Sequence, residues 1–193
     1  MTEAEARKAV GAEQTLYTLP AGATEVILVR HCASEAAIPG QRFSLVDGHS
    51  DPNLSELGRA QAELVAAPLA DEPVARVFVS PLRRTHQTIA PYVRASGHEP
   101  TIVHELREVH FGEWEGGEYR VRAWRGDPLV KRIHEEERWD LIPGAESLEV
   151  FGARVRAGIE RVVEETGPDR GRRRRRPRRG DRRAVPAGTM PAK

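Results

Sequence analysis

Two short stretches of the sequence place cations and a nucleophile where phosphate chemistry could occur. Arg30 and His31 stand at the end of the apolar run EVILVR, and Arg83 and Arg84 follow shortly after a second run, RVFVS. A neutral imidazole beside a guanidinium is a good nucleophile for phosphorus, because the cation disfavours protonation of the ring and holds phosphate oxygens by paired hydrogen bonds. Taken alone, the Arg30–His31 pair is better explained as a strand end whose histidine simply satisfies its hydrogen bonds.

The second arginine pair strengthens the case for an anion site. Pro81 favours a helix that starts just before Arg83 and Arg84. Cations at a helix N-terminus oppose the helix dipole, so a bound anion explains them better than a solvated helix start does. Arginines from two strand ends that face one crevice indicate a phosphate site.

The stretch LREVHFGEWEG supplies candidate acids. Phosphoryl transfer to a histidine needs a group that protonates the leaving oxygen. A carboxyl group close to a doubly charged phosphate has a raised pKa and can serve. Glu108 is the candidate, and Glu105, Glu113 and Glu115 are its rivals in the same stretch. Because most glutamates are surface residues, this stretch by itself indicates little.

The elements that must position these residues alternate along the chain. We predict buried strands at Glu25–Arg30, Arg76–Ser80 and Thr101–His104, where short β-branched runs occur. Helices are predicted to begin at Ser55, Pro81 and Ser147. Strands alternating with helices favour an α/β domain with a largely parallel sheet, which binds ligands at the carboxyl ends of its strands.

The first of these helices carries an apolar face that includes Leu57 and Leu64, which we expect to be buried.

Composition narrows the class of protein. The 193 residues favour one domain, and residues 1–24 are expected to form a mobile leader before it, without a signal-peptide pattern. Cys32 is the single cysteine, so no internal disulfide can form, which suits a reducing compartment. The longest aliphatic run, Val26–Val29, is too short to cross a membrane. We therefore expect a cytoplasmic protein with no membrane partner.

Five stretches together resemble the histidine phosphatase superfamily, the group that includes the cofactor-dependent phosphoglycerate mutases. They occur in the family's order, from about residue 25 to 165: LVRHCAS, DPNLSELGRAQAE, VFVSPLRRTHQTIAP, LREVHFGEWEG and PGAESLEVFGARV. The resemblance implies a three-layer αβα sandwich with a mostly parallel sheet, like that of phosphoglycerate mutase. We therefore expect residues 25–168 to form a histidine phosphatase-like domain that is incomplete at its C-terminus.

The resemblance also implies a role for each candidate residue. His31 would be the nucleophile that forms a phosphohistidine, Arg30 and Arg84 would clamp the phosphate, and Glu108 would protonate the leaving group. Water would then release inorganic phosphate. Arg83 occupies a position that varies in the family and receives no role. The chemistry requires no metal and no other cofactor.

The sequence departs from the family pattern at two places. Cys32 stands where the family usually has a glycine, which suits close approach of the backbone to phosphate. The family also carries a second pocket histidine, followed by glycine, at the end of a late strand. No histidine follows His134 in this chain, and HEEE at His134 lacks the second histidine of a zinc helix. The last core strand is therefore expected to be missing.

An arginine run, GRRRRRPRRGDRR from Gly171 to Arg183, occupies the place of that strand. From Asp169 onward the chain has 11 of its 30 basic and 2 of its 29 acidic residues, a net charge of +9 against −8 for the rest. One choice of codons for Arg172–Arg182, read one base later, encodes Val-Val-Val-Val-Ala-His-Gly-Gly-Val-Ile. We therefore favour a frameshift from about Asp169. Whether the tail is native or a frameshift product, residues 169–193 are expected to be basic and disordered.

The leading hypothesis is a metal-independent phosphomonoester hydrolase for a small phosphorylated metabolite, impaired in the chain as written. Mutase-type transfer is the close alternative, although the insertion between Trp114 and Pro143 looks short for a mutase lid. A catalytically dead phosphate-binding remnant and a polyanion-binding protein acting through the tail also remain open. The tail lacks aromatic residues for base stacking, so no specific nucleic-acid partner is expected.

Overall fold

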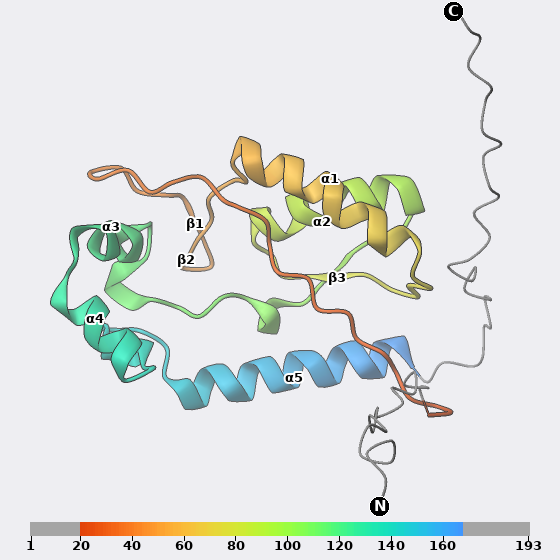
Figure 1. Cartoon of the computed structure of the whole chain (residues 1–193). Coiled ribbons are helices and arrows are strands. Elements are labelled where there is room, and N and C mark those ends of the chain that lie inside the picture. The colour runs from red at the N-terminus through yellow and green to blue at the C-terminus, as the bar shows by residue number, and fades with distance from the viewer. Residues whose placement is uncertain (1–19, 168–193) are drawn as a thin grey trace, which may run out of the picture.

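The computed structural model describes residues 20–167, which form three layers (Figure 1). Helices α1 (Glu56–Ala70) and α2 (Arg83–Ser96) lie on one side. Strands β3 (Phe78–Val79) and β4 (Thr101–Ile102) occupy the middle, and helix α5 (Leu148–Thr166) lies on the other side. The prediction of an α/β fold is confirmed.

Strands β3 and β4 are parallel, as the alternation of elements predicted. Val77, Val79 and Val103 are buried, because this short sheet is covered by α1 and α2 on one face. The strands predicted at Arg76–Ser80 and Thr101–His104 are therefore confirmed, although the paired portions are shorter.

The strand predicted at Glu25–Arg30 is wrong. These residues form no strand, and the side chains of Val26–Val29 are between 38% and 79% exposed. The segment crosses the middle layer between α1 and α2 above and α5 below (Figure 1). A strand becomes buried only when neighbouring strands pair with it, and within residues 20–167 no strand pairs with this one.

Helix α1 begins as predicted but buries a different face. Ser55 caps it, since its hydroxyl accepts a hydrogen bond of 3.1 Å from the amide of Gly58. Leu57 and Leu64 are 62% and 74% exposed, so the predicted face is wrong. The helix instead buries Gly58, Ala62 and Leu69. A Cβ atom on Gly58 would lie 1.9 Å from the carbonyl oxygen of Ala33, so only glycine lets α1 approach so closely.

The smaller elements gather at the other end of the molecule. A hairpin, β1 (Leu45–Val46) with β2 (His49–Ser50), is antiparallel. Helices α3 (Glu118–Arg125) and α4 (Pro128–Glu135) form the insertion. Of the three short 3₁₀ helices in the described part of the chain, η3 (Gly112–Trp114) and η4 (Trp139–Leu141) belong to this end, whereas η2 (His104–Leu106) packs against α5. The insertion packs on its own cluster of buried side chains, Trp114, Val130, Ile133 and Ile142.

Helix α5 starts where Ser147 was predicted to begin it, and Ser147 accepts a hydrogen bond of 3.2 Å from the amide of Val150. Along its 19 residues only Gly158 and Val162 are buried. No helix in the described part of the chain has the length and apolar character that a membrane span requires.

The predicted basic tail and most of the predicted leader lie outside the described residues. Residues 20–24 are described, and the hydroxyl of Thr24 donates to the carbonyl oxygen of Gly167 over 3.1 Å.

Candidate active site

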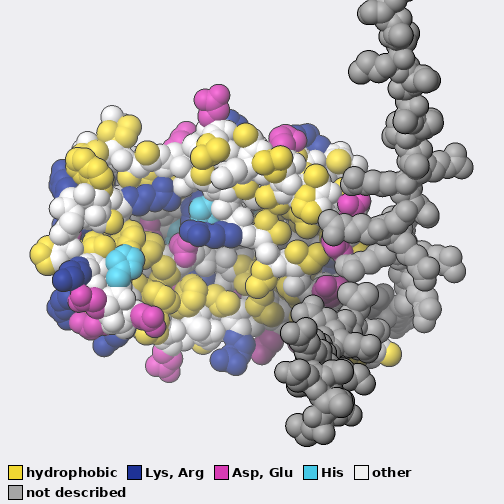
Figure 2. All heavy atoms as spheres, viewed as in Figure 1, with side chains coloured by type: hydrophobic (Ala, Val, Ile, Leu, Met, Phe, Trp, Pro, Cys, Tyr) yellow, Lys and Arg dark blue, Asp and Glu magenta, His cyan; other side chains and the backbone are white. Residues whose placement is uncertain are grey.

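The four residues predicted from the sequence line one pocket of about 220 Å³: Arg30, His31, Arg84 and Glu108. They come from three separate parts of the chain, namely the exposed segment before α1, the start of α2 and the loop after η2. Figure 2 shows a hollow in the middle of one face, with basic, acidic and histidine side chains around it. The tertiary structure therefore brings these four side chains together.

His31 is held in the form that can attack phosphorus. Its Nδ1 lies 2.7 Å from the carbonyl oxygen of Cys32, and because a carbonyl can only accept, Nδ1 carries the proton and Nε2 keeps its lone pair. Burial lowers the pKa of His31, and the charges of Arg84 and Arg30 lower it further, while the Cys32 carbonyl and Glu108 oppose them. The imidazole is therefore neutral near neutral pH.

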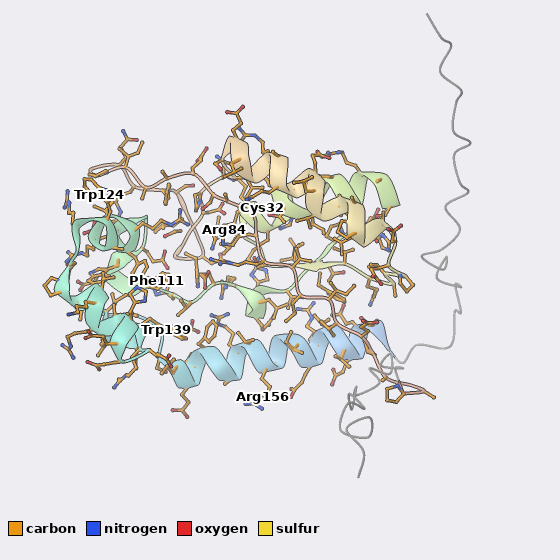
Figure 3. All side chains as sticks on the ribbon, viewed as in Figure 1. Cys32, Arg84, Phe111, Trp124, Trp139 and Arg156 are labelled. Carbon is orange, nitrogen blue, oxygen red and sulfur yellow. The ribbon has the colours of Figure 1, made fainter. Side chains whose placement is uncertain are left out.

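The side chain of Cys32, which stands where the family usually has a glycine, does not enter the pocket. Its side chain is buried against Leu54 and Ala62, beside α1 and α2 (Figure 3), and it does not line the pocket. Its amide donates to the hydroxyl of Thr88 over 3.0 Å, and that hydroxyl donates to the carbonyl oxygen of Arg84 over 2.8 Å. The thiol belongs to the core, and the backbone around it ties the nucleophile to α2.

Arg84 is buried but keeps hydrogen-bonding capacity for a ligand. Figure 3 shows it between α2 and α3. One Nη donates to the carbonyl oxygen of Ser50 over 2.8 Å, whereas the buried Nε has no partner within the described residues. An unpaired buried N–H is costly, so a phosphate oxygen at this position would be stabilised. Burial lowers the pKa of Arg84. Arg30 lies exposed at the rim.

The start of α2 corrects one interpretation of the sequence. The amide of Arg83 donates to Oδ1 of Asp51 over 2.6 Å, and the Arg83 guanidinium lies 3.5 Å from Oδ2. Asp51 is therefore the anion at this helix N-terminus, and Arg84 alone of the pair lines the pocket. Sequence reasoning missed Asp51, although an aspartate within DPNLSELG was the available signal.

Of the four glutamates considered as the proton donor, only Glu108 and Glu115 line the pocket. Glu108 is exposed at the pocket. Glu105 lies 3.7 Å from Arg161 on α5, and Glu113 does not line the pocket. Glu115 lines it but is only 4% exposed. Geometry alone thus favours Glu108 over Glu105 and Glu113.

Glu115 is a second residue that sequence reasoning placed only among the rivals. One oxygen accepts the amide of Ser50 over 2.7 Å and also its hydroxyl, and the other accepts the amide of Phe111 over 2.9 Å. Its carboxylate therefore joins the β1–β2 hairpin to the loop that carries Glu108, and is occupied in holding the pocket together.

The HEEE stretch shows no metal-binding arrangement. Nε2 of His134 lies 3.4 Å from the Tyr119 hydroxyl. Over residues 20–167, no group of three or more His, Cys, Asp or Glu side chains is arranged to hold a metal ion.

Comparisons with known proteins identify the family of this chain. A family model, the histidine phosphatase superfamily (branch 1), matches residues 26–170. The chain is 30% identical over 136 residues to the probable phosphoglycerate mutase GpmB of Photorhabdus laumondii, covering 70% of this chain and 61% of that protein. It is 32% identical over 138 residues to phosphoserine phosphatase 1 of Hydrogenobacter thermophilus, covering 72% and 64%.

A solved structure has the same architecture. The mycobacterial glucosyl-3-phosphoglycerate phosphatase in complex with inorganic phosphate matches with a TM-score of 0.54 and 28% identity, over 69% of this chain and 60% of that one. The chain thus spans less than two thirds of the length of each of these relatives, and it spans 37% of the bifunctional protein Rv2228c of Mycobacterium tuberculosis. Family model, sequence relatives and fold agree, and the chain belongs to the histidine phosphatase superfamily.

Proposed function

We propose that this chain is a phosphatase that hydrolyses small phosphomonoesters through a phosphohistidine at His31. The observation that carries the proposal is that Arg30, His31, Arg84 and Glu108 line one pocket while the Cys32 carbonyl leaves Nε2 of His31 free. Relatives named as phosphatases of phosphoserine and of glucosyl-3-phosphoglycerate support a small phosphorylated substrate. The pocket of about 220 Å³ has room for a phosphate group.

The reaction would proceed in two balanced steps. Nε2 of His31 attacks phosphorus, the bond to the leaving oxygen breaks, and Glu108 gives its proton to that oxygen. Water then attacks phosphorus, the Glu108 carboxylate takes a proton from that water, and the bond between phosphorus and Nε2 of His31 breaks. This releases phosphate and restores both residues. Arg30 and Arg84 stabilise the phosphoryl oxygens through both steps.

Labelling tests the proposal directly. Brief incubation with a ³²P-labelled phosphomonoester should give a protein-bound label that is acid-labile and alkali-stable. His31→Ala should abolish the label, whereas the matched control His134→Ala, outside the pocket, should keep it. Label retained in His31→Ala would overturn the assignment. Phosphate binding without label would favour a catalytically dead remnant, and isomerised phosphoglycerate without net phosphate release would favour a mutase.

We further propose that this chain has a lower phosphatase rate than it would have if residues 26–29 formed a paired strand. Arg30 and His31 continue directly from Val26–Val29, whose side chains are exposed and whose backbone pairs with no strand of the described part. A nucleophile must be held within a fraction of an ångström of its reactive position. An unpaired segment holds it less firmly than a strand within a sheet would.

A further inference from the structure

The pocket contains a charged residue that the proposed reaction does not use. Arg120, on α3, lines the pocket together with Arg30, Arg84 and Glu108. It therefore adds a third guanidinium to a site in which two suffice to clamp a phosphate. The question is what this additional charge binds.

The protein positions Arg120 with uncharged partners. Its two Nη atoms donate to the carbonyl oxygen of Glu35 and to the hydroxyl of Ser34, each over 2.9 Å. Its guanidinium carbon lies 5.6 Å from the centre of the Phe43 ring. None of these groups carries a negative charge, and among the described residues no carboxylate forms an ion pair with Arg120. The guanidinium is thus held in place by neutral groups, and the charge of Glu108 acts on it without forming an ion pair.

The two acidic side chains of the pocket, Glu108 and Glu115, do not prevent a second anion from binding. Glu115 is engaged by two backbone amides and a hydroxyl, and Glu108 is needed in its protonated form when the leaving group departs. Burial lowers the pKa of Arg120 and the charge of Glu108 raises it, so Glu108 and Arg120 are close enough to interact. Once a phosphate has occupied Arg30 and Arg84, Arg120 remains as a free cation.

Arg120 also lies where the leaving group would extend. Phe43 and Glu35, which hold Arg120, line a second hollow of about 490 Å³, and Phe43 lines both hollows. A leaving group that extends from the phosphate pocket toward this second hollow would pass Arg120. Three N–H groups of the guanidinium remain for a ligand, since each Nη uses one of its two hydrogens and Nε is not engaged.

We propose that Arg120 binds a carboxylate on the leaving group, so that this chain selects small phosphomonoesters that are also carboxylic acids. A carboxylate fits better than a second phosphate, because it is smaller and a cavity of 220 Å³ already holds the reacting phosphate. This inference rests on the proposed function, and its test is chosen to separate the two.

Equilibrium binding to the full chain carrying His31→Ala, which prevents turnover, gives the test. Calorimetry should compare 3-phosphoglycerate with glycerol 3-phosphate, which differ by the carboxylate. The acid should bind about 10- to 100-fold more tightly, as expected for a charge-assisted hydrogen-bonded pair. Adding Arg120→Gln should bring the ratio of the two affinities close to one, and Arg120→Lys should restore part of it. Arg125→Gln removes the same charge from the same helix away from the pocket and should leave the ratio as it was.

Two outcomes of this comparison of ligands would overturn the inference. One is equal binding of 3-phosphoglycerate and glycerol 3-phosphate before Arg120 is changed. The other is an Arg120→Gln variant that weakens both ligands by the same factor, because a purely structural role would do so and leave the ratio intact. A bisphosphate that binds more tightly than the acid would also count against a carboxylate. Binding of inorganic phosphate, measured separately, tests the phosphate site formed by Arg30 and Arg84. If phosphate did not bind, the proposed function would be contradicted rather than this inference.

Discussion

The hydroxyl of Thr24 donates a hydrogen bond of 3.1 Å to the carbonyl oxygen of Gly167, which joins the start of the exposed segment to the end of α5. The C-terminal end of α5 therefore lies beside the start of the exposed segment that contains Val26–Val29. The aliphatic side chains of Val26–Val29 are exposed, and Figure 1 shows this segment crossing the molecule between α1 and α2 on one side and α5 on the other. A strand that followed Gly167 and ran beside this segment would cover them.

The first prediction compares the chain as written with a version that continues Val-Val-Val-Val-Ala-His-Gly-Gly in the shifted frame. Covering several aliphatic side chains contributes roughly 1.5–3 kcal/mol each, so the thermal midpoint of the shifted version should be higher by about 10 °C or more. A pocket histidine that donates to the phosphoryl group should raise the phosphatase rate by about 10²–10³-fold. Thermal unfolding and phosphate release measure both.

A chain truncated after Gly167 is the control for that comparison. It should match the chain as written in thermal midpoint, because the arginine run cannot bury an unpaired charge beside Val26–Val29 without a cost of several kcal/mol. If the chain as written equals the shifted version in both stability and rate, the frameshift hypothesis is wrong and the tail is a native part of a working protein.

Glu108→Gln should lower the turnover rate by about 10²–10⁴-fold, because the amide cannot protonate the leaving oxygen. Glu105→Gln, a change of the same kind in a carboxyl group that lies 3.7 Å from Arg161, is the matched control and should have little effect on rate. The loss should be smaller for a substrate whose leaving group needs no proton, such as p-nitrophenyl phosphate. Equal losses from the two variants would contradict the role given to Glu108.

The pH dependence of the rate follows from the electrostatics of His31. Only the neutral ring attacks, so kcat/KM should rise with pH through the pKa of His31, which lies below its usual value of 6.5. Burial is the largest cause of that shift, and the charges of Arg84 and Arg30 add to it. Arg84→Gln removes one of those charges, raises the pKa and should move the acidic limb of the profile to higher pH.

Arg83→Gln is the control for the pH profile, since Arg83 is paired with Asp51 and does not line the pocket. Its acidic limb should coincide with that of the unchanged chain. A limb that stays in place in Arg84→Gln, or moves to lower pH, would contradict the assignment of this limb to His31.

Gly58→Ala should destabilise the fold by about 1–3 kcal/mol or more, because the added Cβ would lie 1.9 Å from the carbonyl oxygen of Ala33. Ala33 is two residues from His31, so activity should fall as well. Gly152→Ala on α5 meets no atom within 4 Å and should stabilise the helix by roughly 0.5–1 kcal/mol. Urea unfolding distinguishes the two; similar effects of both would show that α1 can move away from Ala33 without loss.

Local signals in the sequence were enough for most of the framework. Ser55 and Ser147 begin helices because a serine side chain can cap free amides whatever surrounds it. The runs at β3 and β4 form strands because β-branched residues suit a covered sheet. The order of the motifs, with arginines and His31 after apolar runs, indicated that these residues would meet at one edge.

Side-chain choices within the pocket depended on packing between distant segments. Asp51 and Glu115 satisfy amides of α2 and of the hairpin, so they are structural, while Glu108 faces the pocket. Arg120 gains its proposed ligand only because Phe43 and Ser34 hold it beside the phosphate clamp. The family motifs singled out Glu108 and Arg84, but composition and periodicity did not reveal the roles of Asp51, Glu115 and Arg120, since those roles depend on which partners the fold brings within hydrogen-bond distance.

Val26–Val29 mark the boundary between the two kinds of information. The sequence by itself determined that this run is apolar and suited to a buried strand, because that depends only on its own side chains. Whether it is buried was decided by tertiary structure, since backbone amides and carbonyls of a strand are satisfied by other strands and not by itself. Within residues 20–167 no strand pairs with it, so its side chains stay exposed.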